Sequence, residues 1–124
     1  MLKERISNFT DLKTWQLGHE IVLDVYKLTK IFPREELFGL ISQLRRAVIS
    51  VTSNIAEGFS RSTAKDKAYF YAVSLGSLTE VQNQLLIARD LGYITKDQYI
   101  ALLFKIIETI RMTNGLIKSA AGRN

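Results

Sequence analysis

The pattern that most constrains the fold is an apolar stripe in the middle of the chain. Its members are spaced alternately four and three residues apart: Leu37, Ile41, Leu44, Val48, Val51 and Ile55. This spacing puts them on one face of an α-helix, and such a face must be buried against other elements.

A second stripe with the same spacing runs beside the first. It consists of small or hydrogen-bonding residues, namely Gln43, Ala47, Ser50, Asn54 and Glu57. A solvated helix face would usually carry Lys and Glu at these positions, so this face is expected to contact a partner. Gly58 is predicted to end the helix, because glycine readily adopts the left-handed conformation of a C-terminal cap.

Three further helices are predicted from capping residues and apolar spacing. The first begins at Thr10 or Asp11, and its seam is Leu12, Trp15, His19, Val22, Tyr26 and Thr29. The third has the seam Tyr71, Ser74, Leu78, Val81, Leu85 and Ala88 and ends at Gly92. Gly76, inside this helix, suggests the close approach of another backbone.

The fourth helix is predicted to start with a capping box formed by Thr95 and Gln98. Its predicted seam is Ile100, Leu103, Phe104, Ile107, Ile110, Asn114 and Ile117. The second and fourth helices are apolar over more than half a turn, which is wider than a bundle interior requires. Self-association would bury the surplus.

These segments predict an all-α fold, an up-down-up-down antiparallel four-helix bundle. The helices are expected at about residues 11–31, 35–57, 63–91 and 95–120, within a single domain spanning residues 1–124. A chain of 124 residues that is 47% apolar is long enough for one core and too short to suggest two.

Composition limits the location and the partners. The chain has no Cys, no apolar leader and no stretch long enough to span a membrane, so a cytoplasmic protein is expected. The net charge of +5 permits attraction to nucleic acid. Its excess lies in residues 37–62, with a net charge of +2, and residues 95–124, with +3.

Several short motifs carry a resemblance to a known family. They are Asp11-Leu12, Trp15-Gln16, His19, Val25-Tyr26, Thr29, Phe32-Pro33, Glu36, Phe38-Gly39-Leu40, Gln43, Arg45-Arg46-Ala47, Asn54-Ile55-Ala56-Glu57-Gly58, Arg61, Gly76-Ser77, Glu80, Ala88 and Leu91-Gly92-Tyr93. Taken together, the chain resembles the four-helix-bundle proteins encoded in intervening sequences of bacterial 23S ribosomal RNA genes.

The resemblance implies a bundle that assembles into a ring-like homopentamer. It also implies similarity to the accessory proteins of diversity-generating retroelements, which are basic pentamers thought to bind nucleic acid. It supplies no catalytic residues.

The residues themselves favour no enzyme. We find no nucleophile paired with a base, no metal-ligand cluster and no phosphate-binding glycine loop, so no catalytic residue, metal or cofactor is predicted. His19 is the only histidine and is expected to pack or cap. Asn54 and Glu57, beside Gly58, are interpreted as structural.

The candidate nucleic-acid-binding residues are cations in the two basic segments. They are Arg45, Arg46, Arg61, Lys105, Arg111 and Lys118. For Arg45 and Arg46 the alternatives are a subunit contact or an ion pair with Glu80, which antiparallel second and third helices would bring to the same level. A structural polar stripe is predicted from Gln43, Ser50, Asn54, Glu57, Ser77 and Glu80.

The sequence therefore predicts a non-enzymatic homo-oligomer that binds RNA or DNA through charge and shape. The alternative is a structural or protein-interaction module without a nucleic-acid ligand, in which the arginines serve only assembly.

Overall fold

The computed structural model describes residues 5–122, which form an antiparallel four-helix bundle and contain no strand. The helices are α1 (Lys13–Thr29), α2 (Ser42–Ser60), α3 (Ala64–Asp90) and α4 (Lys96–Ala121). The predicted fold class is confirmed. Residues 1–4 and 123–124 of the predicted domain lie outside the described residues.

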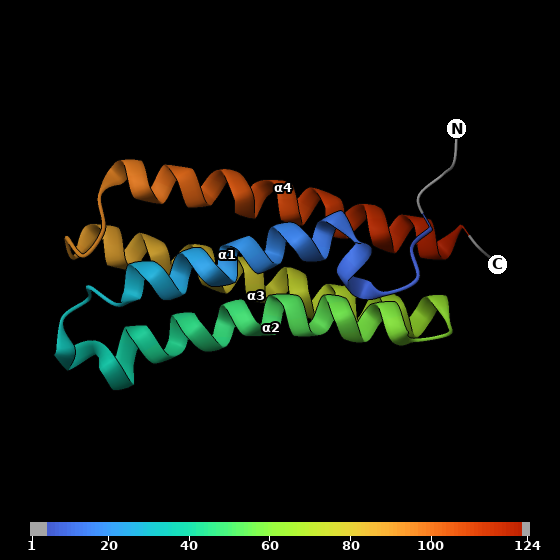
Figure 1. Cartoon of the computed structure of the whole chain (residues 1–124), viewed down its shortest axis with the longest axis horizontal. Helices are drawn as coiled ribbons and strands as arrows, with labels where there is room; N and C mark the ends of the chain where they lie inside the picture. The colour runs from blue at the N-terminus through green and yellow to red at the C-terminus, as the bar shows by residue number, and fades with distance from the viewer. Residues whose placement is uncertain (1–4, 123–124) are drawn as a thin grey trace.

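Each helix packs against two neighbours. Helices α1 and α3 both contact α2 and α4, so α2 and α4 occupy opposite corners of the bundle. Figure 1 shows this arrangement, with α4 at the top, α2 at the bottom, and α1 and α3 between them.

The predicted capping box of α4 is present, and α3 is also capped by a threonine. The Thr63 hydroxyl accepts a hydrogen bond from the backbone N–H of Asp66, and Thr95 and Gln98 form a reciprocal capping box. Gly92 ends α3 with φ of 82°, as expected of a glycine stop. The first helix begins later than predicted. Asn8 caps a short 3-10 turn, η1 (Phe9–Asp11), and α1 begins only at Lys13.

The predicted second helix is interrupted near its start. It opens with a 3-10 turn, η2 (Arg34–Glu36), followed by a π-helical turn, η3 (Leu37–Ile41), before α2 begins. Gly39 leaves the helical conformation, with φ of −111° and ψ of −112°. A Cβ at this position would lie 2.9 Å from Oε1 of Glu36, the carboxylate that accepts a hydrogen bond from the Leu40 backbone N–H.

Gly58 does not end α2, so that prediction was wrong. The helix continues to Ser60, and within the described residues only Gly92 has a positive φ. The glycine is required for packing instead, because a Cβ there would come within 2.6 Å of the Tyr71 ring. The predicted close approach at Gly76 is also absent from the described chain, where a Cβ would meet nothing within 4 Å.

The core is drawn from all four helices. Ile21, Leu44, Leu78 and Ile106, one from each, are completely buried. The predicted seam of α3 is confirmed, and so is that of α2 except for Leu37, which is exposed. Several polar residues in the core are hydrogen-bonded to backbone carbonyls; the Ser74 hydroxyl on α3, for example, donates to the Val51 carbonyl on α2 at 2.9 Å.

The predicted seam of α4 was largely wrong, although two of its members, Leu103 and Ile110, are partly buried against the core. The helix buries the neighbouring stripe, which consists of Tyr99, Leu102, Ile106, Thr109, Thr113 and Ala120. Its threonines fit the interior because their hydroxyls donate to backbone carbonyls one turn earlier. Three residues of the predicted seam therefore face outward, with exposed fractions of 43% for Ile100, 77% for Phe104 and 57% for Ile107.

The seam of α1 was only partly correct. Leu12 and Thr29 are buried as predicted. The rest of the buried face is Thr14, Gly18, Ile21 and Val25, one residue away from Trp15, His19, Val22 and Tyr26 of the predicted seam. The first two of these buried residues have little apolar character, so the hydrophobic pattern alone did not reveal them.

Candidate nucleic-acid interface

The six predicted cations do not form one surface in a single chain. Arg45, Arg46 and Arg61 lie on or just after α2, whereas Lys105, Arg111 and Lys118 lie on α4. Since α2 and α4 occupy opposite corners, the two sets are separated by the bundle. A polyanion that contacts both sets would have to wrap around the bundle or bridge different copies.

Arg45 is turned toward α1. Its guanidinium lies 4.6 Å from the centre of the Tyr26 ring, and its Nε donates to the Thr29 hydroxyl at 3.0 Å. These contacts are a cation–π interaction and a hydrogen bond to a buried residue. Arg45 therefore helps to hold α2 against α1.

The predicted ion pair of Glu80 with Arg45 or Arg46 is not formed among residues 5–122, so that prediction was wrong. Arg45 points away to α1, and Glu80 accepts a long hydrogen bond from Gln84 at 3.4 Å. Arg46 is exposed and lines the same hollow as Glu80 without pairing with it.

Arg61 is committed to local contacts at the end of α2. It pairs with Glu57, one turn earlier, at 2.8 Å, and its guanidinium lies 4.6 Å from the centre of the Phe70 ring on α3. About two fifths of both charged side chains remain exposed, 43% for Arg61 and 45% for Glu57, so the pair is screened by solvent.

On α4 the three cations differ in their surroundings. Lys105 bridges to α1, with its ammonium 2.7 Å from Asp24 and 3.2 Å from Glu20, and the hydrogen bond to Asp24 raises the pKa of Lys105. Arg111 pairs with Glu108 on the same helix, which lowers the pKa of the Glu108 carboxyl. Lys118 is exposed and has no ion-pair partner in the part of the chain that the structure describes.

The predicted polar stripe lies mostly between α2 and α3. Ser50 and Ser77 share a hydrogen bond of 2.7 Å across the two helices, and Asn54 donates to Ser50. Further along, Gln84 reaches Gln43 at 3.5 Å and Glu80 at 3.4 Å. Glu57 is turned to Arg61 instead. Helix α3 is thus the partner that this face of α2 was expected to contact.

A hollow of about 560 Å³ opens at one end of this contact, and we call it the α2/α3 hollow. Its lining residues are Phe38, Ser42, Gln43, Arg46, Glu80, Asn83 and Gln84. Phe38, carried by the π-helical turn, is 93% exposed, while Gln84 is only 5% exposed. The Oε1 atom of Gln84 is buried without a hydrogen-bond partner among the described residues.

Phe38, Ser42 and Asn83 were not identified as site residues from the sequence. The available signal was the pair Phe38-Gly39 at the start of a helix, since glycine there often marks an irregular turn. An aromatic side chain of this size is normally buried, but Phe38 lies in the irregular turn around Gly39 and is exposed.

A second hollow, also of about 560 Å³, lies between α1 and α4. Lys27, Lys30 and Lys105 surround an apolar floor that includes Leu28 and Leu102. Lys105 is held by Asp24 and Glu20, so part of the positive charge is already compensated. Lys27 and Lys30 were not among the candidate cations selected from the sequence, because they lie outside the two segments with a net positive charge.

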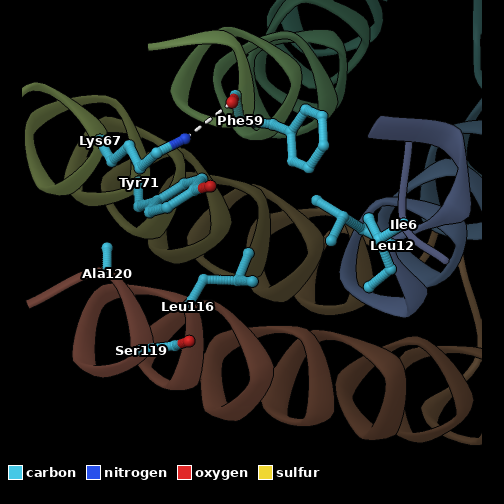
Figure 2. A pocket seen from close by; sticks show the side chains of 8 residues that line it. All are labelled: Ile6, Leu12, Phe59, Lys67, Tyr71, Leu116, Ser119 and Ala120. Atoms are coloured by element: carbon cyan, nitrogen blue, oxygen red, sulfur yellow. Dashed lines mark hydrogen bonds between the residues drawn. The ribbon is translucent and has the colours of Figure 1, made fainter. Parts of the chain in front are cut away.

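A third hollow, of about 390 Å³, lies where η1 meets the ends of α2, α3 and α4. Figure 2 shows Tyr71 beside it, with Lys67 directed to the end of α2. The Lys67 ammonium donates to the carbonyl oxygens of Phe59 at 2.7 Å and Gly58 at 3.3 Å. The charged group of this hollow therefore stabilises the last turn of α2.

His19 is exposed and stacks on Trp15, with ring centres 4.7 Å apart. No group of three or more His, Cys, Asp or Glu residues within 5–122 could hold a metal ion. None of the described helices combines the length and apolar character needed to cross a bilayer.

A solved structure shares the fold of this chain. It is the crystal structure of a protein with unknown function from the S23 ribosomal protein family of Bacteroides thetaiotaomicron, with a TM-score of 0.78 and 21% sequence identity. The match covers 85% of this chain and 98% of that chain. No functionally curated protein matches the sequence significantly.

The family of the chain follows from a match at the level of sequence. The family model described as 23S rRNA-intervening sequence protein matches residues 10–115, which include most of α1 through α4 and all the motifs of the resemblance. The chain therefore belongs to the 23S rRNA-intervening sequence protein family.

Proposed function

We propose that the protein is a non-enzymatic homo-oligomer, assembled as a ring-like pentamer, that binds RNA or DNA through charge and shape. The observation that carries this proposal is the outward face of α4. Its first half is the exposed apolar stripe of Ile100, Phe104 and Ile107, and its second half carries the cations Arg111 and Lys118.

The apolar half supports self-association. Contiguous exposed apolar residues on a soluble protein favour an interaction surface, and burial of a large aromatic such as Phe104 is strongly favourable. A ring requires that this stripe contact a different patch on the next copy. Each contact would bring the basic half of one α4 close to a neighbouring copy.

Repetition of the charge supports nucleic-acid binding. The net charge of +5 per chain would become about +25 in a pentamer, which is sufficient to attract a polyanion at moderate salt. The exposed cations Arg46 and Lys118 have no ion-pair partner within residues 5–122 and are available for phosphate.

The competing function is a structural or protein-interaction module without nucleic acid. It is favoured by the intramolecular partners of Arg45, Arg61, Lys105 and Arg111. The test measures light-scattering mass together with binding to duplex DNA and structured RNA across a salt series. A large oligomer whose affinity falls steeply with salt is expected.

The controls separate the two parts of the proposal. Phe104→Ser should reduce the mass, whereas Leu91→Ser, at an exposed apolar residue after α3, should not. A monomer mass for the wild type would refute the assembly. If the wild type binds neither RNA nor DNA at low salt, the protein-interaction function is the better explanation.

A further inference from the structure

We infer that the α2/α3 hollow binds one unpaired base of a nucleic-acid strand, with preference for bases that present an exocyclic amino group. This inference rests on the proposed nucleic-acid function and specifies a site for it. The evidence comes from the ring at the mouth of the hollow, the amides in its wall and the position of its charges.

Phe38 provides a stacking surface. Its ring is 93% exposed, although an aromatic side chain of this size is normally buried. The π-helical turn keeps it there, because Glu36 accepts hydrogen bonds from the Leu40 N–H at 3.2 Å and from the Tyr93 hydroxyl at 2.8 Å. Exposed aromatic side chains are the usual stacking platform for unpaired bases, and Arg46 lines the same hollow as Phe38.

Gln84 provides an unused acceptor. Its Oε1 is buried and has no partner within residues 5–122, and its Nε2 makes only two long hydrogen bonds, of 3.4 and 3.5 Å. The polar atoms of buried amides are normally hydrogen-bonded, so Oε1 of Gln84 is expected to accept a hydrogen bond from a donor on a bound ligand. Gln84 lines the hollow, which places its amide beside a base bound there.

The charges of the hollow orient a nucleotide. Arg46 is exposed and unpaired within the described chain, so it can contact a phosphate. Glu80 is on the α3 side and repels phosphate but accepts hydrogen bonds from an amino group, as carboxylates do with cytosine N4. Glu80 and the Gln84 Oε1 are both acceptors, which favours cytosine, adenine or guanine over uracil.

The size and polarity of the hollow agree with a small polar ligand better than with a second copy of the chain. A volume of about 560 Å³ lies within the usual range for ligand sites, about 300–1,000 Å³. Glutamate is depleted at subunit interfaces, whereas this lining contains Glu80.

The test uses the full-length protein and single-stranded oligomers of cytidine and of uridine, about 12 nucleotides long, with a duplex of the same length. The wild type should bind the cytidine strand more tightly than the uridine strand. Phe38→Ala should weaken single-strand binding by about tenfold or more and leave duplex binding nearly unchanged. Phe38→Tyr should bind single strands as the wild type does. Tyr69→Ala, at an exposed aromatic residue on α3, is the matched control.

Gln84→Met tests the amide without opening a cavity. The variant should lose the preference for cytidine, because its affinity for the cytidine strand should fall about five- to tenfold. Its thermal stability should stay the same or rise. If Phe38→Ala binds the cytidine strand as well as the wild type does, or if cytidine and uridine bind equally, the base site is refuted while the proposed function stands.

Two further outcomes would also overturn the inference, each with its own conclusion. A lower light-scattering mass for Phe38→Ala would mean that the hollow contacts another copy of the chain. If the wild type binds neither single strands nor duplex at low salt, both the base site and the proposed nucleic-acid function fail.

Discussion

The hydroxyl of Tyr93 donates a hydrogen bond of 2.8 Å to Oε2 of Glu36, which lies 57 residues earlier in the chain. The bond joins the loop between α3 and α4 to the turn that precedes α2. Through the second oxygen of the same carboxylate, it also supports the turn that carries Phe38.

This bond should make stability depend on pH at the alkaline end. The hydrogen bond to Glu36 raises the pKa of Tyr93 above its ordinary value of 10.0. The protonated phenol is therefore favoured in the folded state. Its contribution is complete below pH of about 10 and is lost as pH rises through the raised pKa.

Urea unfolding of the wild type and of Tyr93→Phe, from about pH 9 to about pH 11.5, measures this effect. The variant should be less stable at the lower pH, and the difference should shrink as pH rises. A constant difference across the range would show that the hydrogen bond does not contribute in this way.

Gly58 and Gly76 form a matched pair of helix glycines. Gly58→Ala should destabilise by about 1–3 kcal/mol, because its Cβ would overlap the Tyr71 ring in a packed interior. Gly76→Ala should stabilise by about 0.5–1 kcal/mol, since its Cβ meets nothing in the described chain and alanine favours the helix. Chemical denaturation checks both, and a destabilising Gly76→Ala would indicate a close contact between copies.

Arg45 and Arg46 are adjacent in sequence and should behave in opposite ways. Arg45→Gln removes the contacts with Tyr26 and Thr29 and should cost about 1–2 kcal/mol of stability. Arg46→Gln, at an exposed position, should change stability by less than about 0.5 kcal/mol.

The two variants should also differ in how their binding to duplex DNA depends on salt. Arg46→Gln should reduce the slope of log affinity against log salt by about one unit for each chain that contacts the DNA. Arg45→Gln should leave the slope unchanged. Equal slopes for Arg46→Gln and the wild type would exclude a phosphate contact at Arg46.

The contact of Lys105 with α1 should be weak and sensitive to salt. Lys105→Gln removes the pairs with Asp24 and Glu20, but 34% of the lysine side chain is exposed, so the cost should be below about 1 kcal/mol. At about 1 M salt the difference from the wild type should nearly vanish. Lys118→Gln, which removes no ion pair within residues 5–122, is the control and should show no such salt dependence.

Much of the fold could be predicted from local sequence. The caps at Thr63 and Thr95, the stop at Gly92 and the seam of α3 depend on residues within a few positions of one another, so their physics is already contained in the chain segment. Helical spacing and short connections were enough to predict the bundle.

Local sequence could not decide which face of α4 is buried. Its two adjacent stripes both have helical spacing, and the more apolar one leaves Phe104 and Ile107 exposed. The buried stripe contains Thr109 and Thr113, which become suitable core residues only because their hydroxyls bond to the carbonyls one turn earlier.

The candidate site depended even more on tertiary structure. Sequence alone determined that Arg45 and Arg46 are adjacent cations on a helix with a polar stripe. Their directions were decided by neighbours: Tyr26 and Thr29 on α1 draw Arg45 inward, while Arg46 falls on the outer side of the helix. Because successive residues of a helix point about 100° apart, packing assigns adjacent side chains to different surroundings.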